Sequence, residues 1–336
     1  MVRKMERTKV IDIDGILTKE TEGFSESAYK NRTPNKRNIT VVRDLKKRGF
    51  KIILHTARFK IDRELTVDWL KKHNVPYDEL ILGKPQAETY YDDKASNVLD
   101  QEVICFSGGI DSLIAWHYLN FPKPIYIKIN HRYQEKEIKS IKTLESLIPK
   151  LKVEFIEGPD LSQFEVGDKA YISQRNLHLA LMASHYGNKI YINGIKGDNV
   201  EDKNKQAFKT MSFAMNSIKK ESEPTISIDS PFWNMTKTDI IKWYRKNYDE
   251  LYVRSTLKMS VSCYDSTILG SCGRCPSCFR KWIAIENAGI DARIYFESDI
   301  TEWSGIQLYV EKMKQGMYDQ QRTLETKAVL KKYNLW

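Results

Sequence analysis

Residues 105–113 read C-F-S-G-G-I-D-S-L, and this stretch decides the fold that the sequence predicts. The apolar residues that end at Cys105 are typical of a buried parallel strand. The Ser-Gly-Gly sequence predicts a tight turn, and a helix is expected to begin near Asp111 and to end near Leu119. A strand, a glycine turn and a helix N-terminus make an anion site, because free backbone N–H groups and the helix dipole converge on one point.

The turn lacks the lysine of the common phosphate-binding loop, whose spacing is G-x-x-x-x-G-K-[ST]. The sequence S-G-G-I-D-S at residues 107–112 instead resembles the signature of the PP-loop ATP pyrophosphatases. That resemblance implies cleavage of ATP between the α- and β-phosphates and adenylation of a carbonyl or amide oxygen. The alternative is a turn that only joins a strand to a helix.

Length and composition indicate a globular protein of two domains. The chain has 336 residues, of which 41% are hydrophobic, and a net charge of +10. This charge fits a nucleic-acid partner, anionic substrates such as ATP, or lysine-rich solvated faces. We find no signal peptide and no apolar run of about 18 residues, so we expect a cytoplasmic protein without a membrane-bound part.

Residues 1–100 carry four short motifs, each of which follows a predicted strand or turn. Strands are predicted at residues 9–13, 51–54 and 80–82, and amphipathic helices at residues 36–48 and 61–73. The motifs are D-I-D-G at 12–15, H-T-A-R at 55–58, G-K-P at 83–85 and D-D-K at 92–94. Two carboxylates at a strand end suit phosphoryl transfer, in which one attacks phosphorus and the other moves the leaving-group proton.

These motifs resemble, over residues 7–97, the haloacid dehalogenase superfamily, and most closely small phosphatases of bacterial surface-sugar gene clusters. The resemblance implies that Asp12 is the nucleophile and that Asp14 is the general acid and base. Thr56 would bind the transferring phosphoryl group, and Lys84 would offset its negative charge. Asp12 would bind Mg²⁺ together with Asp92 or Asp93. Residues 18–34 are short and polar, so we expect a flap and an open site. The alternative is a degenerate domain that is kept for folding or assembly.

Strands and helices alternate from residue 103 onward, which predicts a parallel sheet covered on both faces. Strands are expected at residues 103–105, 125–129, 153–156, 189–192 and 226–228. Ligands bind at the carboxyl ends of such strands, where the Ser-Gly-Gly turn, Asn130, Asn193 and Gly194 would lie. Residues 196–205 are acidic and irregular, and predict either a substrate loop or a solvated loop.

Four of the five cysteines fall within sixteen residues: Cys263, Cys272, Cys275 and Cys278. Thiolates at this spacing supply the closed tetrahedral shell of a structural zinc site. An iron–sulfur cluster, which also takes four thiolates, is the alternative. Cys105 lies in the apolar strand and is expected in the core.

Five motifs of residues 102–285 together resemble the 7-cyano-7-deazaguanine synthase family. They are S-G-G-I-D-S, Q-R-N-L at 174–177, I-N-G at 192–194, S-P-F-W-N-M-T-K at 230–237, and Cys263-Tyr264 with C-G-R-C-P-S-C-F-R at 272–280. That family converts 7-carboxy-7-deazaguanine to the nitrile with ATP and ammonia. The resemblance implies an AMP-forming C–N ligase that adenylates the carboxylate, then the amide.

The resemblance also implies which residues bind ATP and Mg²⁺. Those expected to hold pyrophosphate are Ser107, Gly108, Gly109 and Ser112. Asp111 would place Mg²⁺, and Arg175 would stabilise charge near the α-phosphate or the substrate carboxylate. Lys237 would reach a phosphate, or else be a surface lysine in the first turn of a helix.

The sequence departs from the synthase pattern in two places, residues 131–133 and 198–206, where the usual Q-R-H and Tyr-Pro-Asp elements are replaced. These changes leave open whether the nitrile is released or, as in relatives from bacterial antiviral defence, a deazaguanine is passed to a protein acceptor. A tRNA-modifying PP-loop enzyme and a catalytically decayed partner protein also remain open. The sequence shows no ammonia source.

Helical spacing returns in residues 296–336, at 300–317 and 324–333. We expect this tail to pack on the ATP domain or on a second copy of the chain in a homodimer. The predicted architecture is therefore α/β. It has a haloacid-dehalogenase-like domain at 1–100, a PP-loop domain with a zinc knuckle at 101–295, and a helical tail at 296–336.

Overall fold

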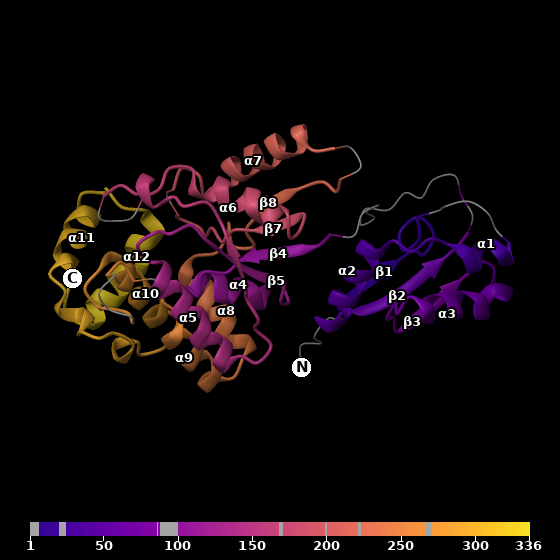
Figure 1. Ribbon diagram of the computed structural model, residues 1–336. Helices are drawn as coiled ribbons and strands as arrows, with labels where there is room; N and C mark the ends of the chain where they lie inside the picture. Colours follow the sequence, from indigo (N-terminus) through magenta and orange to yellow (C-terminus); the bar gives the residue numbers. More distant parts are fainter. Residues whose placement is uncertain are drawn as a thin grey trace. The chain divides into compact units, whose positions relative to one another are not determined.

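The computed structural model describes residues 7–19, 25–85, 87, 100–167, 171–198, 200–220, 223–261, 263–265 and 270–336. The chain forms two compact units, residues 1–101 and residues 102–336, each with its own parallel sheet (Figure 1). The prediction of parallel α/β sheets is confirmed. Within the described ranges, no helix is both long enough and apolar enough to cross a membrane.

Unit 1 is a three-stranded parallel sheet in the order β1-β2-β3. Its elements are β1 (Thr8–Ile11), α1 (Glu26–Asn31), α2 (Lys36–Lys47), β2 (Lys51–Thr56), α3 (Arg63–Lys72) and β3 (Glu79–Leu82). Every second residue of β2 is buried, including Ile52 and Leu54. This period of two places one face of the central strand in the core.

The expectation of a polar flap at residues 18–34 is wrong for its second half. Helix α1 lies there, and its Tyr29 is completely buried. The guanidinium carbon of Arg58 lies 4.5 Å from the Tyr29 ring centroid, and Trp69 donates to the carbonyl of Arg32 over 3.0 Å. A single aromatic residue in a polar segment does not mark a core helix by periodicity, so the local signal for this helix is its N-cap, Ser25, whose side chain accepts from the Ala28 N–H.

Unit 2 contains a five-stranded parallel sheet in the order β6-β5-β4-β7-β8. The strands are β4 (Glu102–Cys105), β5 (Lys123–Lys128), β6 (Glu154–Glu157), β7 (Lys189–Tyr191) and β8 (Ser227–Asp229). Strands β5 and β6 are added in turn on one side of β4. Strands β7 and β8, which follow in the sequence, are added on the other side of β4. Such a reversal of strand order leaves a crevice at the carboxyl ends of the two central strands, where ligands bind.

Two helical layers cover this sheet, as Figure 1 shows. Helices α6 (Arg175–Ser184) and α7 (Lys205–Ile218) pack on one face with Val103. The other face, which includes Ile104, is covered by α4 (Ile110–Tyr118), α5 (Gln134–Leu147), α8 (Lys237–Asn247), α9 (Glu250–Met259) and α10 (Pro276–Asn287). Val103 and Ile104, which are consecutive, therefore pack into different cores, which is why both central residues of β4 are apolar.

The C-terminal residues pack within unit 2. Helices α11 (Gly305–Lys314) and α12 (Gln320–Lys332) contribute Val310 and Leu330 to the same core as α10. A capping box at Thr236 begins α8, with Thr236 and Asp239 bonding each other's backbone N–H groups. The cap fixes the entry of α8, and with it the position of Lys237 in the first turn.

His117 of α4 makes the stability of unit 2 pH-dependent. Its Nδ1 donates to the carbonyl of Leu113 and its Nε2 accepts from the Tyr252 hydroxyl, both over 2.8 Å. Burial lowers its pKa from 6.5 to about 4. Between pH 4 and pH 6.5, His117 is therefore protonated in the unfolded chain and neutral in the folded protein. The stabilisation is complete above pH 6.5 and is lost as pH falls toward 4, by roughly 3 kcal/mol.

Urea denaturation of the protein and of His117→Gln at several pH values checks this expectation. The free energy of unfolding should fall more steeply between pH 6.5 and 4 in the unsubstituted protein than in the variant. Equal slopes would show that His117 does not remain neutral in the fold.

Candidate functional site

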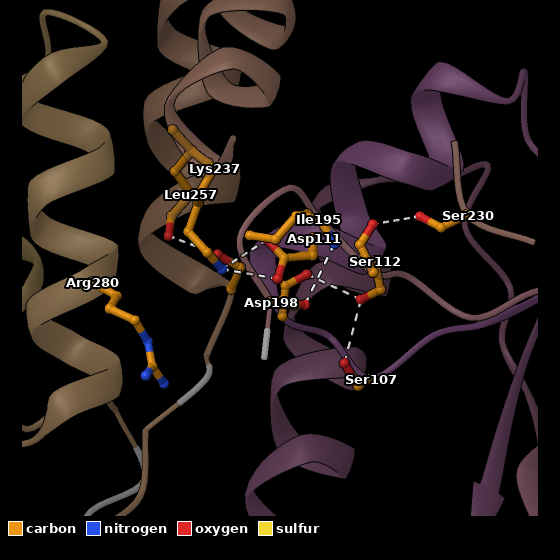
Figure 2. A network of polar contacts seen from close by, with 12 residues as sticks. Ser107, Asp111, Ser112, Ile195, Asp198, Ser230, Lys237, Leu257 and Arg280 are labelled. Carbon is orange, nitrogen blue, oxygen red and sulfur yellow. Dashed lines mark hydrogen bonds and ion pairs between the residues drawn. The ribbon is translucent and has the colours of Figure 1, made fainter. Parts of the chain in front are cut away.

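The Ser-Gly-Gly turn lies between the carboxyl end of β4 and the N-terminus of α4, and Gly109 is the N-cap residue of that helix. The buried Ser112 hydroxyl donates to the Gly109 carbonyl over 3.0 Å and lies 3.4 Å from the Ser107 hydroxyl (Figure 2). The first N–H groups of α4 have no intrahelical partner. The turn therefore has the donors and the dipole that an anion site requires.

Gly108 holds the turn against α5. Its φ is +72°, and the Ser140 hydroxyl donates to its carbonyl over 3.0 Å. A Cβ built on Gly108 would lie 2.9 Å from the Ser140 Oγ and 3.2 Å from the Ile141 Cγ1. Both the backbone conformation and the lack of space require glycine here.

Asp111 and Lys237 form an ion pair at the edge of the turn. The Lys237 Nζ lies 2.7 Å and 2.8 Å from the two carboxylate oxygens (Figure 2). Both side chains are about one quarter exposed or less. The sequence prediction that Lys237 reaches a phosphate is untested. The ion pair nevertheless places the lysine beside the turn rather than on an outer surface.

A cleft of about 730 Å³, open solvent included, lies at the carboxyl ends of β4, β5 and β7. The lining includes Ser107, Asp111, Ser112, Arg175, Asn193 and Lys203, together with the apolar residues Phe106, Ile125, Ile127, Ile129, Leu179 and Ile192. The cleft thus joins the anion site to an apolar surface on which a base can lie.

The cleft brings together several residues that the sequence singled out. Arg175 is the first residue of α6, and Gln174 before it has a φ of +56°. Asn193 donates to the carbonyl of Cys105 over 3.5 Å, and its buried side-chain oxygen has no partner among the described residues. This oxygen is free to accept from a bound ligand.

The acidic stretch 196–205 is not a freely solvated loop. Asp202 accepts from the backbone and side-chain nitrogens of Asn176 over 2.9 Å and 2.8 Å, and so caps α6. Asp198 pairs with Lys203 over 2.8 Å and with Arg322 over 3.3 Å. Burial raises the pKa of Asp198, but Lys203 and two further cations outweigh it, so the pKa lies below its usual value.

The cleft also contains a polar cluster that the sequence did not reveal. The Tyr126 hydroxyl donates to Glu137 over 2.8 Å, and the His131 Nε2 lies 3.2 Å from the same carboxylate. Burial, followed by the charge of Glu137, raises the pKa of Tyr126. Two signals in the sequence marked His131, its position just after β5 and the replacement of the usual Q-R-H element at residues 131–133, but none marked its partners. Its neighbour Arg132 pairs instead with Glu165, away from this cluster.

The four clustered cysteines bring their sulfur atoms within 4.8 Å of one another and are all buried. Cys263 and Cys275 are 4.0 Å apart, and Cys272 and Cys278 are 3.9 Å apart. A tetrahedral zinc site with Zn–S bonds of about 2.3 Å has sulfur–sulfur edges of about 3.8 Å. The donor set therefore fits one zinc ion.

Backbone amides stabilise these thiolates. N–H groups donate to the sulfur atoms over 3.2 to 3.4 Å, from Asp265, Cys272, Arg274 and Cys278. The cysteine at 275 is also the N-cap of α10, followed by Pro276 at the first helical position. Gly273 has a φ of +77°, and a Cβ there would lie 2.3 Å from the Ser298 carbonyl oxygen. The knuckle is thus tied both to α10 and to the segment that leads into the C-terminal helices.

Unit 1 places three predicted site residues at the carboxyl ends of its strands. The Lys84 Nζ lies 3.0 Å from the Asp12 carboxylate, and the backbone N–H of Lys84 donates to the Thr56 carbonyl over 3.0 Å. Asp92 and Asp93, the predicted Mg²⁺ ligands, lie outside the described residues. Asp12, Thr56 and Lys84 converge because parallel strands end at the same edge.

Asp14 is held by two buried arginines. Arg58 makes two hydrogen bonds of 2.8 Å to its two carboxylate oxygens, and Arg32 lies 3.3 Å from one of them. Both guanidinium groups are at least nineteen-twentieths buried. In this arrangement Asp14 acts as an anchor of the core. A role as proton donor would require it to exchange these partners.

A family model described as "Queuosine biosynthesis protein QueC" matches residues 156–289. Unit 2 contains a QueC-like domain. The matched region runs from β6 to the end of α10 and includes the cysteine cluster. The match, the PP-loop geometry and the cleft together support ATP use by this domain. A second family model, the LNS2 domain of PITM 1-3, matches residues 9–103 and gives unit 1 a phosphatase-like fold. The finer haloacid dehalogenase assignment remains a prediction.

Solved structures give partial likenesses only. A structural-genomics target from Vibrio cholerae is 32% identical, over 27% of this chain and 82% of that chain, with a TM-score of 0.24. A chain of the Pnkp1/Rnl/Hen1 complex is 21% identical, over 35% of this chain and 45% of its own, with a TM-score of 0.22.

A third chain, from a structure described as the Pnkp1/Rnl/Hen1 RNA repair complex, is 16% identical, over 47% of this chain and 44% of its own, with a TM-score of 0.22. The present chain spans less than half the length of these last two proteins, and at such TM-scores the likenesses carry no argument. None of the curated proteins matches this chain.

Proposed function

We propose that unit 2 is an ATP-dependent enzyme that adenylates the carboxylate of a 7-deazaguanine and forms an amide and then a nitrile. The observation that carries this proposal is the Ser-Gly-Gly turn at the N-terminus of α4, which opens into a cleft at the reversal of strand order. The QueC-like match over residues 156–289 supports the deazaguanine as acceptor.

In this proposal the turn binds the β- and γ-phosphates of ATP, and the acceptor carboxylate attacks the α-phosphorus. Pyrophosphate leaves to the turn, where the α4 dipole stabilises its charge. Ammonia then attacks the carbonyl carbon, and AMP departs with one carboxylate oxygen. A second ATP adenylates the amide oxygen, which leaves as AMP while the amide nitrogen loses its protons to give the nitrile.

Residues that line the cleft would offset the negative charge of the phosphates. Asp111 would hold Mg²⁺, which neutralises part of this charge. Lys237 would then leave the Asp111 carboxylate and bind a phosphate oxygen. Arg175, which lines the cleft, would stabilise charge at the α-phosphate. Zinc in the four-cysteine site would be structural, because the closed shell leaves no position for substrate.

Product analysis tests the proposal. The protein is incubated with ATP, Mg²⁺, ammonium and 7-carboxy-7-deazaguanine, and AMP and pyrophosphate are quantified. AMP formation that depends on the acid supports the proposal, whereas AMP formation stimulated only by tRNA would assign a tRNA-modifying enzyme. Mass spectrometry of the small molecules and of co-expressed proteins then distinguishes a released nitrile from a protein conjugate, the form expected of an antiviral defence system.

For unit 1 we propose Mg²⁺-dependent phosphoryl transfer with Asp12 as nucleophile. Lys84 at 3.0 Å would offset the negative charge of the carboxylate and the phosphate. Thr56 would hold the transferring phosphoryl group, and Asp92 or Asp93 would complete the Mg²⁺ site with Asp12. The roles of Asp12, Thr56 and Lys84 are supported by their position at the strand ends. The role of Asp92 or Asp93 follows from the resemblance to the haloacid dehalogenase motifs alone.

Asp12→Asn is expected to lower phosphate-ester hydrolysis at least 10³-fold, because the amide cannot attack phosphorus. The measurement is phosphate release from p-nitrophenyl phosphate and from a panel of sugar phosphates with Mg²⁺. Asp68→Asn, an exposed position on α3, is the matched control and should retain full activity. Equal residual rates in the two variants, or no turnover of any ester by the unsubstituted protein, would favour a unit kept for folding or assembly.

A further inference from the structure

A second cavity lies beside the nucleotide cleft, between α8, α10 and α12. Its volume is about 450 Å³, open solvent included. The apolar part of its wall comes from Phe279, Ile283, Ala284 and Ile195, and Tyr318 closes one side. Because this volume includes open solvent, the site is a recess that a small molecule would fill only in part.

The wall of this cavity carries four cationic side chains and one carboxylate: Lys196, Lys237, Arg280, Arg322 and Glu325. Glu325 accepts from the Thr238 hydroxyl over 2.7 Å, a neutral partner that does not offset its charge. Lys237 and Arg322 pair with Asp111 and Asp198, respectively. The four cations thus exceed these three carboxylates by one positive charge.

Among the described residues, the cations of the wall without a carboxylate partner are Arg280, which is half-buried, and Lys196, which is exposed to solvent. Neither forms an ion pair with any residue that the structure describes, and the Arg280 guanidinium donates to the neutral Tyr264 hydroxyl over 2.9 Å. In Figure 2, Arg280 extends from α10 into the space beside Lys237. A half-buried guanidinium without a counter-ion favours an anionic ligand, since such a ligand restores charge balance.

The backbone makes room for the arginine of α12. Gly197 has a φ of +83°, and a Cβ there would lie 2.8 Å from the Arg322 Nε. Asp198, the next residue, fixes the same guanidinium by its ion pair. Arg322 is thus held in place at the cavity wall by the turn that follows β7.

The cavity and the nucleotide cleft share one wall. Lys237 lines the cavity, Asp111 lines the cleft, and the two side chains bind each other over 2.7 Å. The cavity and the cleft are therefore adjacent and are separated at this point by one ion pair. Adjacent sites are a requirement for a reaction between two bound substrates.

We propose that this cavity is the acceptor site: it binds a small planar carboxylic acid, with the acid group on Arg280, Lys196 and Arg322 and the ring on Phe279. This inference deepens the proposed function and rests on it for the identity of the acid. It assigns to α12, which lies beyond the region matched by the family model, a part in acceptor binding. Arg322 is therefore a specificity-determining residue that this chain carries outside its QueC-like segment.

Calorimetric titration tests the acceptor site directly. The full chain is titrated with 7-carboxy-7-deazaguanine and, separately, with indole-3-carboxylate, each with and without α,β-methylene-ATP. Arg280→Ala and Arg322→Ala should each weaken acid binding at least tenfold and leave the affinity for α,β-methylene-ATP unchanged. Lys331→Ala, an exposed position on the same helix as Arg322, is the matched control and should bind like the unsubstituted protein. Zinc content is measured for Arg280→Ala, since this residue follows the last cysteine.

The possible outcomes test the acceptor site and the proposed function separately. Saturable binding of either acid that both arginine variants weaken supports the acceptor site, even where no AMP is formed with 7-carboxy-7-deazaguanine. The absence of AMP contradicts only the proposed function. No saturable binding of either acid, or binding that the arginine variants leave unchanged, overturns the acceptor site even where AMP is formed.

Discussion

Replacing Gly108 by alanine is expected to abolish acid-dependent AMP formation, with a loss of at least 10²-fold in kcat/KM for ATP. The added methyl group would meet the Ser140 hydroxyl at 2.9 Å, and the backbone is in the left-handed region at a φ of +72°. Relief of this contact would move the turn off α5 and misplace the amides that bind phosphate. The measurement is steady-state AMP release at varied ATP.

Gly316→Ala provides the matched control for Gly108→Ala. Gly316 has nearly the same φ, +70°, but a Cβ there would meet nothing within 4 Å. The two variants share the backbone strain of about 1–2 kcal/mol, and only Gly108→Ala adds the clash in the turn. We therefore expect the two variants to lose similar amounts of stability, and only Gly108→Ala to lose kcat/KM for ATP. If both variants keep full ATP turnover, the turn is not the phosphate site.

Cys272→Ser is expected to cause the largest loss of stability. Zinc bound by four thiolates contributes on the order of 10 kcal/mol or more to folding in small zinc domains. The four sulfur atoms lie in the same core as α8, α10 and the C-terminal helices, so loss of the ion should loosen this whole layer. Zinc content measured by atomic absorption should fall, and thermal unfolding should begin tens of degrees lower or the protein should not accumulate.

Cys105→Ser is the control for Cys272→Ser. Cys105 lies at the end of β4 outside the cysteine cluster, and burial raises the pKa of its thiol to about 12. This substitution should leave the zinc content at one ion per chain. A Cys272→Ser protein that retains both zinc and stability would contradict a structural zinc site, and an iron signal in place of zinc would assign a cluster.

The sequence predicted the parts of the fold that depend on local pattern. Apolar runs marked β4 and β5. The position of Asp12, Thr56 and Lys84 at one edge agrees with the rule that parallel strands end together, although the sequence assigned their roles from a resemblance. The sequence T-K-T-D at 236–239 is typical of a capping box, and α8 begins there. Each of these features is encoded within a few consecutive residues or by a general topological rule.

Contacts between distant segments were not predictable in this way. Lys237 and Asp111 are 126 positions apart, and nothing in either local sequence identifies the other as a partner. Arg322 lies on a helix whose apolar pattern predicts a buried face but not what that face meets. Asp14 shows the same limit, because the motif suggested a catalytic acid and tertiary packing surrounds it with Arg32 and Arg58. The site is therefore assembled largely by side chains whose partners only the fold selects.

The most direct test of the central claim follows an oxygen atom. 7-Carboxy-7-deazaguanine labelled with ¹⁸O in both carboxylate oxygens is incubated with the protein, ATP, Mg²⁺ and ammonium, and AMP is analysed by mass spectrometry. If the acid is adenylated at the Ser-Gly-Gly turn, the AMP carries ¹⁸O from the carboxylate, and pyrophosphate forms in equal amount. Formation of ADP and phosphate, or of AMP that contains no ¹⁸O, would contradict this account.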